Sequence, residues 1–115
     1  EADERVAKVH YPGLASHLQH DIVTSLFRAG GSLLSFELHE SIDAFDYLNR
    51  LQLAIPASNL GDNRTLVIPV AHTIFFEMGA ERRASMGIAE SLIRVSVGIE
   101  DTDDLVGDFR QALDA

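Results

Sequence analysis

One arginine, Arg94, stands inside the most apolar strand-like segment of this acidic protein, residues 92–97. A guanidinium keeps its charge under ordinary conditions, so among apolar residues it is costly unless an anion meets it. Side chains alternate along a strand, which puts Arg94 on the face opposite to Ile93 and Val95. We therefore expect Arg94 either to point out of the sheet toward a bound acid or to pair with an Asp or Glu of the chain itself.

The other residues that could carry chemistry form no complete site. His17 and His20 lie three residues apart in a predicted helix, but zinc needs three or four ligands and no known spacing supplies a third. Asp101, Asp103 and Asp104 resemble part of a calcium loop, yet the turn glycine is missing, and the start of a helix accounts for them better. The sequence has no glycine-rich phosphate loop and no nucleophile motif. We expect no self-contained catalytic apparatus.

The composition limits the class of protein. A chain of 115 residues, 46% of them hydrophobic, can form one globular domain with a modest core. Its net charge of −9 argues against nucleic acid and anionic membrane surfaces as partners. The chain has no cysteine, which excludes disulfides and thiol chemistry and fits a cytoplasmic location. No apolar stretch is long enough to span a bilayer.

Apolar periodicity and turn residues divide the chain into short elements. Strands are expected at residues 6–9, 33–38, 66–68, 73–76 and 92–97, helices at 16–28, 41–52, 81–86 and from 101 onward, and a polar turn at 56–63. Ser16 with Gln19 is expected to form a capping box, Ser41 to cap the second helix, and Asp101 to open the last one. Two-residue hairpins and long parallel crossovers are both scarce. The pattern therefore predicts an α+β fold with a small, mostly antiparallel sheet packed with helices.

Several blocks of the sequence, taken in order, resemble a single family. They are Tyr11-Pro12-Gly13-Leu14-Ala15-Ser16-His17, Gly30-Gly31 before Ser35-Phe36-Glu37-Leu38, Asn59-Leu60-Gly61-Asp62, Thr65-Leu66, and Leu92 to Asp101 with Asp104-Leu105. Together they resemble the C-terminal domain of the Cys/Met metabolism (trans-sulfuration) family of pyridoxal-phosphate-dependent enzymes. That family includes cystathionine γ-synthase, the cystathionine lyases, methionine γ-lyase and the O-acylhomoserine sulfhydrylases.

The resemblance implies a part of an enzyme. Residues 1–8 would be a linker from a missing larger domain, and residues 9–115 the C-terminal small domain of a fold-type I enzyme. In the family, the larger domain carries the lysine that binds pyridoxal 5'-phosphate; Lys8, the one lysine here, is in the wrong context for that role. The parent enzyme would make or break a carbon–sulfur bond in cystathionine, methionine or an O-acylhomoserine, and the fragment alone would be inactive. The family implies a homotetramer, built as a dimer of dimers.

The resemblance assigns substrate binding to this chain, and no catalytic or cofactor-binding residue. Arg94 matches the family arginine that pairs with the substrate α-carboxylate, a role that suits its planar fork of donors. Asn59 stands where a Ser-Leu-Gly motif usually has serine, with Leu60 next to it, and Ser58 matches a position that varies with substrate preference. For Ser58, Asn59 and Asp62, ordinary turn chemistry is the competing interpretation.

The chain departs from the family pattern after Thr65-Leu66. Ile68-Pro69-Val70 and Thr73-Ile74 stand where many members have His-Pro-Ala and Thr-His. This leaves β-elimination, γ-elimination and γ-replacement open, with γ-chemistry on a homoserine ester or cystathionine favoured on family frequency alone. The alternative from a different class is a free-standing acidic α+β binding module whose Arg94 is structurally paired.

Overall fold

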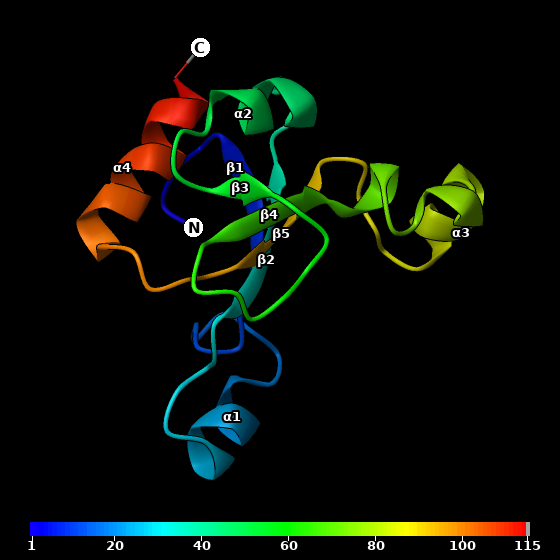
Figure 1. Ribbon diagram of the computed structural model, residues 1–115. Helices are drawn as coiled ribbons and strands as arrows, with labels where there is room; N and C mark the ends of the chain where they lie inside the picture. The colour runs from blue at the N-terminus through cyan, green and yellow to red at the C-terminus, as the bar shows by residue number, and fades with distance from the viewer. Residues whose placement is uncertain (115) are drawn as a thin grey trace.

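The computed structural model describes residues 1–114, which form a five-stranded sheet with helices beside it (Figure 1). The strands are β1 (Val6–His10), β2 (Leu33–Leu38), β3 (Ile55–Pro56), β4 (Leu66–Pro69) and β5 (Leu92–Ser96). Their spatial order is β1-β2-β5-β4-β3, and every pair of neighbours is antiparallel except β3 and β4. The predicted α+β fold with a small, mostly antiparallel sheet is confirmed.

The helices of the described chain are α1 (His20–Leu26), α2 (Ala44–Arg50), α3 (Ala80–Ser85) and α4 (Thr102–Leu113), with two 3₁₀ helices, η1 (Val70–His72) and η2 (Phe76–Met78). Helices α2 and α4 pack against each other and cover one face of the sheet (Figure 1). Helices α1 and α3 belong to two segments that extend away from the sheet.

The hydrophobic core fills the space between the sheet and the pair α2 and α4. Ile93 and Val95 of β5 are 0% and 1% exposed. Phe36 of β2 packs edge to face against Tyr47 of α2, with ring centroids 5.9 Å apart. Successive residues of a strand point to opposite faces, so Arg94, between the two buried residues of β5, lies on the face away from this core.

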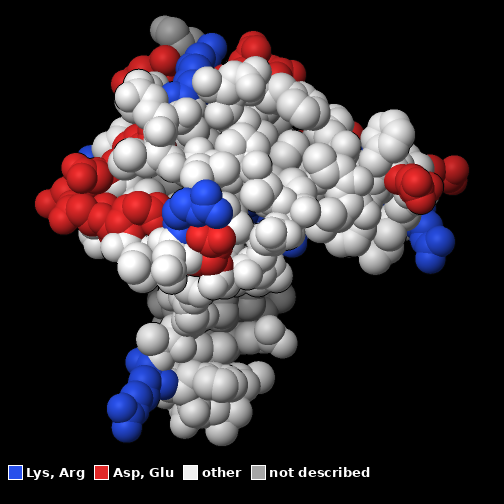
Figure 2. Space-filling view, in the orientation of Figure 1, with Lys and Arg blue, Asp and Glu red and all other residues white. Residues whose placement is uncertain are grey.

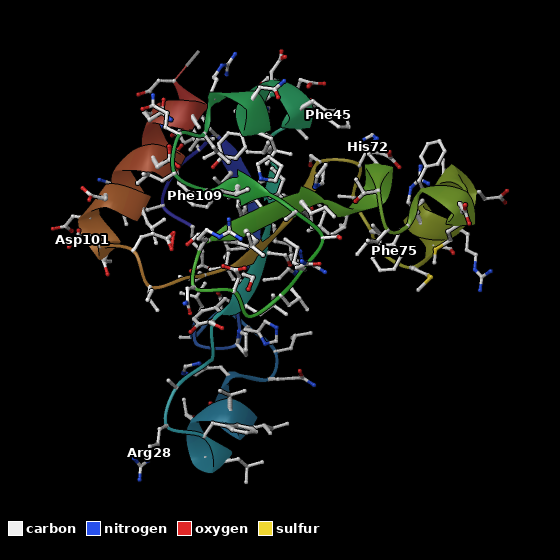
Figure 3. All side chains as sticks on the ribbon, in the orientation of Figure 1. Arg28, Phe45, His72, Phe75, Asp101 and Phe109 are labelled. Atoms are coloured by element: carbon white, nitrogen blue, oxygen red, sulfur yellow. The ribbon has the colours of Figure 1, made fainter. Side chains whose placement is uncertain are left out.

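We call the segment between β1 and β2, residues 11–32, the α1 arm. Helix α1 buries none of its residues, and Ile22, Leu26 and Phe27 are 55%, 71% and 63% exposed. Figure 3 shows its side chains standing clear of the sheet, with Arg28 near the tip. An isolated helix of seven residues has little stability of its own, so an apolar surface of this kind is typical of a segment that packs on a partner.

We call the segment between β4 and β5, residues 70–91, the α3 arm. Arg83 in this arm is 6% exposed. Its guanidinium donates to the main-chain carbonyl of Phe76 at 3.0 Å and forms an ion pair with Glu90 at 3.0 Å. These bonds hold the arm in one compact piece. Like the α1 arm, it presents large apolar side chains to solvent, including Phe76 and Met86.

The predicted helix over residues 16–28 is wrong at its start. Helix α1 begins at His20, and its N-cap residue, Gln19, makes no side-chain cap bond. Residues 11–20 form successive four-residue β-turns, and the Ser16 hydroxyl donates to the Glu1 carboxylate. The capping box therefore does not form, because Ser16 lies before the helix in a different backbone conformation.

The start of α2 also differs from the prediction, whereas that of α4 agrees with it. Asp43, and not Ser41, is the N-cap of α2, and its carboxylate accepts from the N–H groups of Phe45 and Asp46, both at 2.9 Å. A carboxylate caps well because it also meets the positive end of the helix dipole. The predicted cap Asp101 opens α4 in the same way.

Two predictions around β4 are wrong. Residues 73–76 are not extended: residues 73–75 form a turn between η1 and η2, and Phe76 begins η2. The Thr73 hydroxyl donates to the carbonyl of Pro69 at 2.8 Å. Residues 56–63, expected to be a polar turn, begin with Pro56, which is the second residue of β3. This short strand forms because the Ile55 N–H reaches the carbonyl of Thr65 at 2.9 Å, a contact that needs β4 beside it.

Candidate functional site

Arg94 lies in the middle of β5, between β2 and β4. Its cross-strand partners are Ser35 in β2 and Ile68 in β4. The side chain is half-buried, unlike those of its neighbours Ile93 and Val95, which are fully buried. The structure thus places the guanidinium on the open face of the sheet, as the strand alternation predicts.

The direct partner of Arg94 is a main-chain carbonyl. Its Nη2 donates to the oxygen of Ser58 at 2.8 Å. Within residues 1–114, the ion pairs of arginine involve Arg5, Arg64 and Arg83, and no carboxylate lies within ion-pair distance of Arg94. A carbonyl orients a guanidinium but does not neutralise it, so the positive charge is available to an anion.

The loop that carries Ser58 connects β3 to β4; it includes residues 57–64. Ser58, Asn59 and Leu60 are all exposed on it. The N–H of Ala57 bonds the carbonyl of Val67 at 3.0 Å, which continues the parallel pairing and aims the loop at β5. The structure therefore brings the Ser58 carbonyl to Arg94, and Asn59 and Leu60 follow Ser58 on the same exposed loop.

A buried serine fixes the next part of this loop. Ser96 is 3% exposed, and its hydroxyl accepts a hydrogen bond from the N–H of Gly61 at 2.9 Å. Gly61 has φ of +73°, a conformation that favours glycine. Strand alternation places Ser96 on the same face as Arg94 but predicts no role for it; the one signal in the sequence is a hydroxyl two residues from the arginine in an apolar strand.

The far end of the loop is tied to the end of β5. The Thr65 hydroxyl accepts from the N–H of Gly98 at 2.9 Å, and the Thr65 N–H donates to the Glu100 carboxylate at 2.9 Å. Burial would raise the pKa of Glu100, but the donors from Thr65 outweigh it and lower that pKa. A Cβ on Gly98 would lie 2.3 Å from the carbonyl oxygen of Asn63, so only glycine permits this approach.

Between these anchors, Asp62 and Arg64 form a local exposed pair. The Arg64 side chain donates to the Asp62 carboxylate at 3.1 Å and, with a backbone N–H bond from the same residue, lowers the pKa of Asp62 to about 2. Asp62 is therefore an anion that is already partnered within its own turn, in agreement with the turn-chemistry interpretation of this residue.

A buried carboxylate stabilises the opposite side of the sheet. Asp108 of α4 is 5% exposed and accepts from the N–H groups of Gln52, Leu53 and Ala54 at 2.7, 2.9 and 3.0 Å. Burial would raise the pKa of Asp108, but these donors outweigh it and lower that pKa. The sequence itself indicates that Asp108 is buried, because it falls three residues after Leu105 and so lies on the buried stripe of α4.

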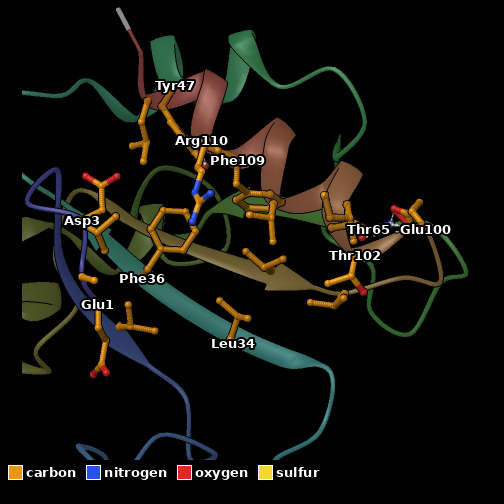
Figure 4. Close-up of a pocket in the computed structure, with 18 of the residues that line it drawn as sticks. Glu1, Asp3, Leu34, Phe36, Tyr47, Thr65, Glu100, Thr102, Phe109 and Arg110 are labelled. Carbon is orange, nitrogen blue, oxygen red and sulfur yellow. Dashed lines mark hydrogen bonds between the residues drawn. The ribbon is translucent and has the colours of Figure 1, made fainter.

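The described residues also enclose a cavity away from Arg94. It has a volume of about 690 Å³ and lies between the sheet and α4, where apolar residues such as Leu34, Phe36 and Phe109 line it (Figure 4). Charged residues also line it, with Asp3 at one end and Glu100 at the other in Figure 4. This cavity belongs to the core face of the sheet. We place the candidate site at Arg94 because the open face carries the unneutralised charge.

The histidines do not form a metal centre. Residues 1–114 contain no group of three His, Asp or Glu side chains placed to hold a metal ion. The Nδ1 of His17 accepts from the N–H of Gln19 at 3.1 Å, and the Nδ1 of His20 bonds the carbonyl of Pro12 at 3.0 Å. Local turn bonds thus account for both side chains.

Charge is unevenly distributed over the visible surface. Figure 2 shows acidic side chains gathered at the start of α4, where Asp101, Asp103 and Asp104 are exposed. Each of these residues lies at the N-cap or in the first turn, where a carboxylate favours the helix dipole. The α1 arm is largely uncharged in the same view. The described chain has no helix long and apolar enough to cross a membrane.

Comparison with known proteins identifies the family of the chain. The family described as Cys/Met metabolism PLP-dependent enzyme matches residues 1–114. An O-succinylhomoserine sulfhydrylase from Mycobacterium tuberculosis is 40% identical over 110 residues, covering 91% of this chain and 27% of the relative. An L-methionine gamma-lyase from Pseudomonas putida is 41% identical over 112 residues, covering 96% of this chain and 28% of the relative.

Solved structures share the fold. The crystal structure of a cystathione gamma lyase from Micromonospora echinospora superposes with a TM-score of 0.93 at 41% identity, covering 99% of this chain and 30% of that one. A cystathionine gamma synthase from Xanthomonas oryzae pv. oryzae, in complex with cystathionine, gives 0.89 at 33% identity, covering 98% and 30%. The chain therefore belongs to the Cys/Met metabolism family of PLP-dependent enzymes. It spans less than a third of the length of these relatives.

Proposed function

We propose that this chain is the substrate-recognition domain of a pyridoxal-phosphate-dependent trans-sulfuration enzyme. The enzyme would form or break a carbon–sulfur bond in cystathionine, methionine or an O-acylhomoserine, with γ-chemistry favoured. The proposal depends on the environment of Arg94. Its half-buried guanidinium lies on the open face of the sheet, is oriented by a main-chain carbonyl, and has no carboxylate within ion-pair distance among residues 1–114.

The role proposed for Arg94 is to bind the α-carboxylate of the amino-acid substrate. One N–H of the guanidinium is taken by Ser58, which fixes the plane of the group, and the remaining N–H groups can meet two carboxylate oxygens side by side. The exposed amide of Asn59 can donate to the same carboxylate, with Leu60 and the Ser58 side chain beside it. These four residues form the proposed substrate-binding set.

The cofactor would be held mainly by another part of the enzyme. Pyridoxal 5'-phosphate supplies an electron sink for the carbanion chemistry of amino acids. Lys8, the one lysine of this chain, is exposed on β1 opposite Glu37. The described residues therefore fit the substrate carboxylate and not the cofactor itself. On its own the chain would be inactive.

We also propose that the two arms pack on the larger domain of the same enzyme. Both arms expose apolar side chains, Ile22 and Phe27 on one and Phe76 and Met86 on the other, and burying such surface is the main drive for association. Residues 1–8 would link the two domains, with residues 6–8 already within β1. The whole protein would be a cytoplasmic homo-oligomer built from dimers.

The alternative, a free-standing acidic binding module, requires a structural partner for Arg94. A paired arginine in such a module would contact an Asp or Glu side chain, and within residues 1–114 the contact is instead with a carbonyl oxygen. This difference favours the enzyme domain.

The test is the absorption spectrum of the protein expressed from its full native reading frame. We expect a visible band from pyridoxal phosphate bound to a lysine, which borohydride abolishes and which shifts when a homoserine ester or cystathionine is added. A colourless full-length protein would contradict the proposal. An assay of thiol, α-keto acid and cystathionine production would then identify the reaction among the three that remain open.

A further inference from the structure

Ser96 has no part in the proposed contact with substrate, yet its hydroxyl is buried and directed at one backbone group. The side chain is 3% exposed and accepts the Gly61 N–H at 2.9 Å. It lies two residues from Arg94 on the same strand and the same face. One strand thus supplies both the proposed ligand of the carboxylate and the anchor of the loop beside it.

The loop between β3 and β4 is held at three points, two of them on β5 and the third on Ile99, three residues after β5 ends. The Ser58 carbonyl receives Arg94 at 2.8 Å, the Gly61 N–H meets Ser96 at 2.9 Å, and the Asn63 carbonyl receives the Ile99 N–H at 2.8 Å. Asn59 and Leu60 lie between the first two points. Their position relative to Arg94 is therefore set from both sides.

Loss of the middle contact, between the Gly61 N–H and the Ser96 hydroxyl, would affect the loop more than the fold. Gly61 is exposed, so without Ser96 its N–H would bond to water at little cost. The sheet would keep its core, but the loop would be free to shift. The bond thus contributes to the placement of the loop more than to the stability of the fold.

We propose that Ser96 is a positioning residue for the substrate carboxylate. Its hydroxyl holds Gly61, Gly61 holds Asn59 and the Ser58 carbonyl in place, and these set the direction of the Arg94 guanidinium. The inference rests on the proposed function and extends it to a residue that touches neither substrate nor cofactor.

The experiment compares Ser96→Ala with Ser91→Ala in the full-length protein. Ser91 is a matched control because its hydroxyl also makes one 2.9 Å bond to the main chain, to Leu38, but at the other end of β5. Hydrogen exchange over residues 57–64, followed by mass spectrometry, reports on the loop. KM and kcat for the amino-acid substrate report on the site, because a lost binding contact raises KM with kcat unchanged.

We expect Ser96→Ala to speed exchange over residues 57–64 and to raise KM about tenfold, with kcat within about twofold. Ser91→Ala should change neither. Ser96→Cys has a side chain of similar size but a weaker hydrogen-bond acceptor. Its KM should therefore lie between those of the wild type and Ser96→Ala. This variant keeps the test open if Ser96→Ala folds poorly.

Unchanged exchange in Ser96→Ala would overturn the inference, and so would faster exchange with an unchanged KM. An equal rise in KM in Ser91→Ala would also overturn it, because the effect would then be general to the strand. A wild-type protein whose spectrum lacks the cofactor band would overturn the proposed function and, with it, this inference. If the inference about Ser96 alone is wrong, the cofactor band is still present in the wild-type spectrum.

Discussion

The Nη2 of Arg94 lies 2.8 Å from the main-chain oxygen of Ser58, 36 residues away in the chain. The guanidinium is thereby oriented without losing its charge, because a carbonyl is a neutral acceptor. An arginine prepared in this way can bind a carboxylate with little further ordering of its long side chain. The proposed function, and the predictions for the site, depend on this relationship.

Arg94→Ala in the full-length protein should weaken the use of the amino-acid substrate. The loss of a charge-assisted contact should cost about 1.5–3 kcal/mol, roughly a ten- to 150-fold fall in kcat/KM. Arg110→Ala is the control, since Arg110 is exposed on α4 on the other side of the sheet. Steady-state kinetics on both variants provide the measurement, and wild-type values for Arg94→Ala would refute the assignment.

Asn59→Ala should raise KM for the same substrate, by about three- to tenfold, because a neutral amide contact contributes less than a charged one. Asn59→Ser should restore most of the affinity, since a hydroxyl can also donate to a carboxylate. Asn63→Ala is the matched control: it is the same residue type in the same loop, and its main-chain oxygen makes the observed bond to Ile99. Equal effects at the two asparagines would show that only the loop conformation matters.

Gly98→Ala should destabilise the protein, because its Cβ would lie 2.3 Å from the Asn63 oxygen and 2.5 Å from the Arg64 carbonyl carbon. Such overpacking costs about 1–3 kcal/mol. Gly107→Ala is the control in the exposed part of α4, where a Cβ meets nothing within 4 Å. There alanine should stabilise the helix by up to about 1 kcal/mol. Urea unfolding midpoints measure both effects, and a neutral Gly98→Ala would contradict the described approach of the two backbones.

Asp108→Asn should destabilise the fold without touching the site. The change keeps the shape but removes the charge that three backbone N–H groups share, and it turns an amide N–H₂ toward donors. We expect a loss of about 2–3 kcal/mol in the free energy of unfolding. Asp104→Asn, at an exposed position in the first turn of the same helix, should lose no more than about 0.3–1 kcal/mol, the usual size of a helix-dipole interaction. Comparable losses in the two variants would argue against the special role of Asp108.

The stabilisation by Asp108 should depend on pH in a defined direction. Its pKa is lower in the folded protein than its usual value of 3.8, so the folded state favours the ionised form. The contribution is therefore complete above the unfolded pKa and is lost as the pH falls through the lower, folded pKa. Unfolding midpoints of wild type and Asp108→Asn should differ by a constant amount above about pH 5 and converge in stronger acid. A difference that grows on acidification would contradict this sign.

Local sequence patterns predicted the elements well where one local choice is dominant. The alternation in β5 predicted the buried Ile93 and Val95, and Asp101 predicted the start of α4. The predicted cap was wrong for α2, because Ser41 and Asp43 are both good caps and the choice depends on where the chain turns into the core. The predicted start was wrong for α1, because that arm has no core contact in this chain to extend the helix.

The sequence by itself determined that Arg94 faces away from the core, because strand periodicity is a local property. It also determined the family, through blocks of residues in order. Only the tertiary structure decided that Ser58 supplies the carbonyl at Arg94, that Ser96 holds Gly61, and that Asp108 meets a segment 54–56 residues away. These contacts depend on strand order and register, which bring distant parts of the chain together and which no local pattern specifies.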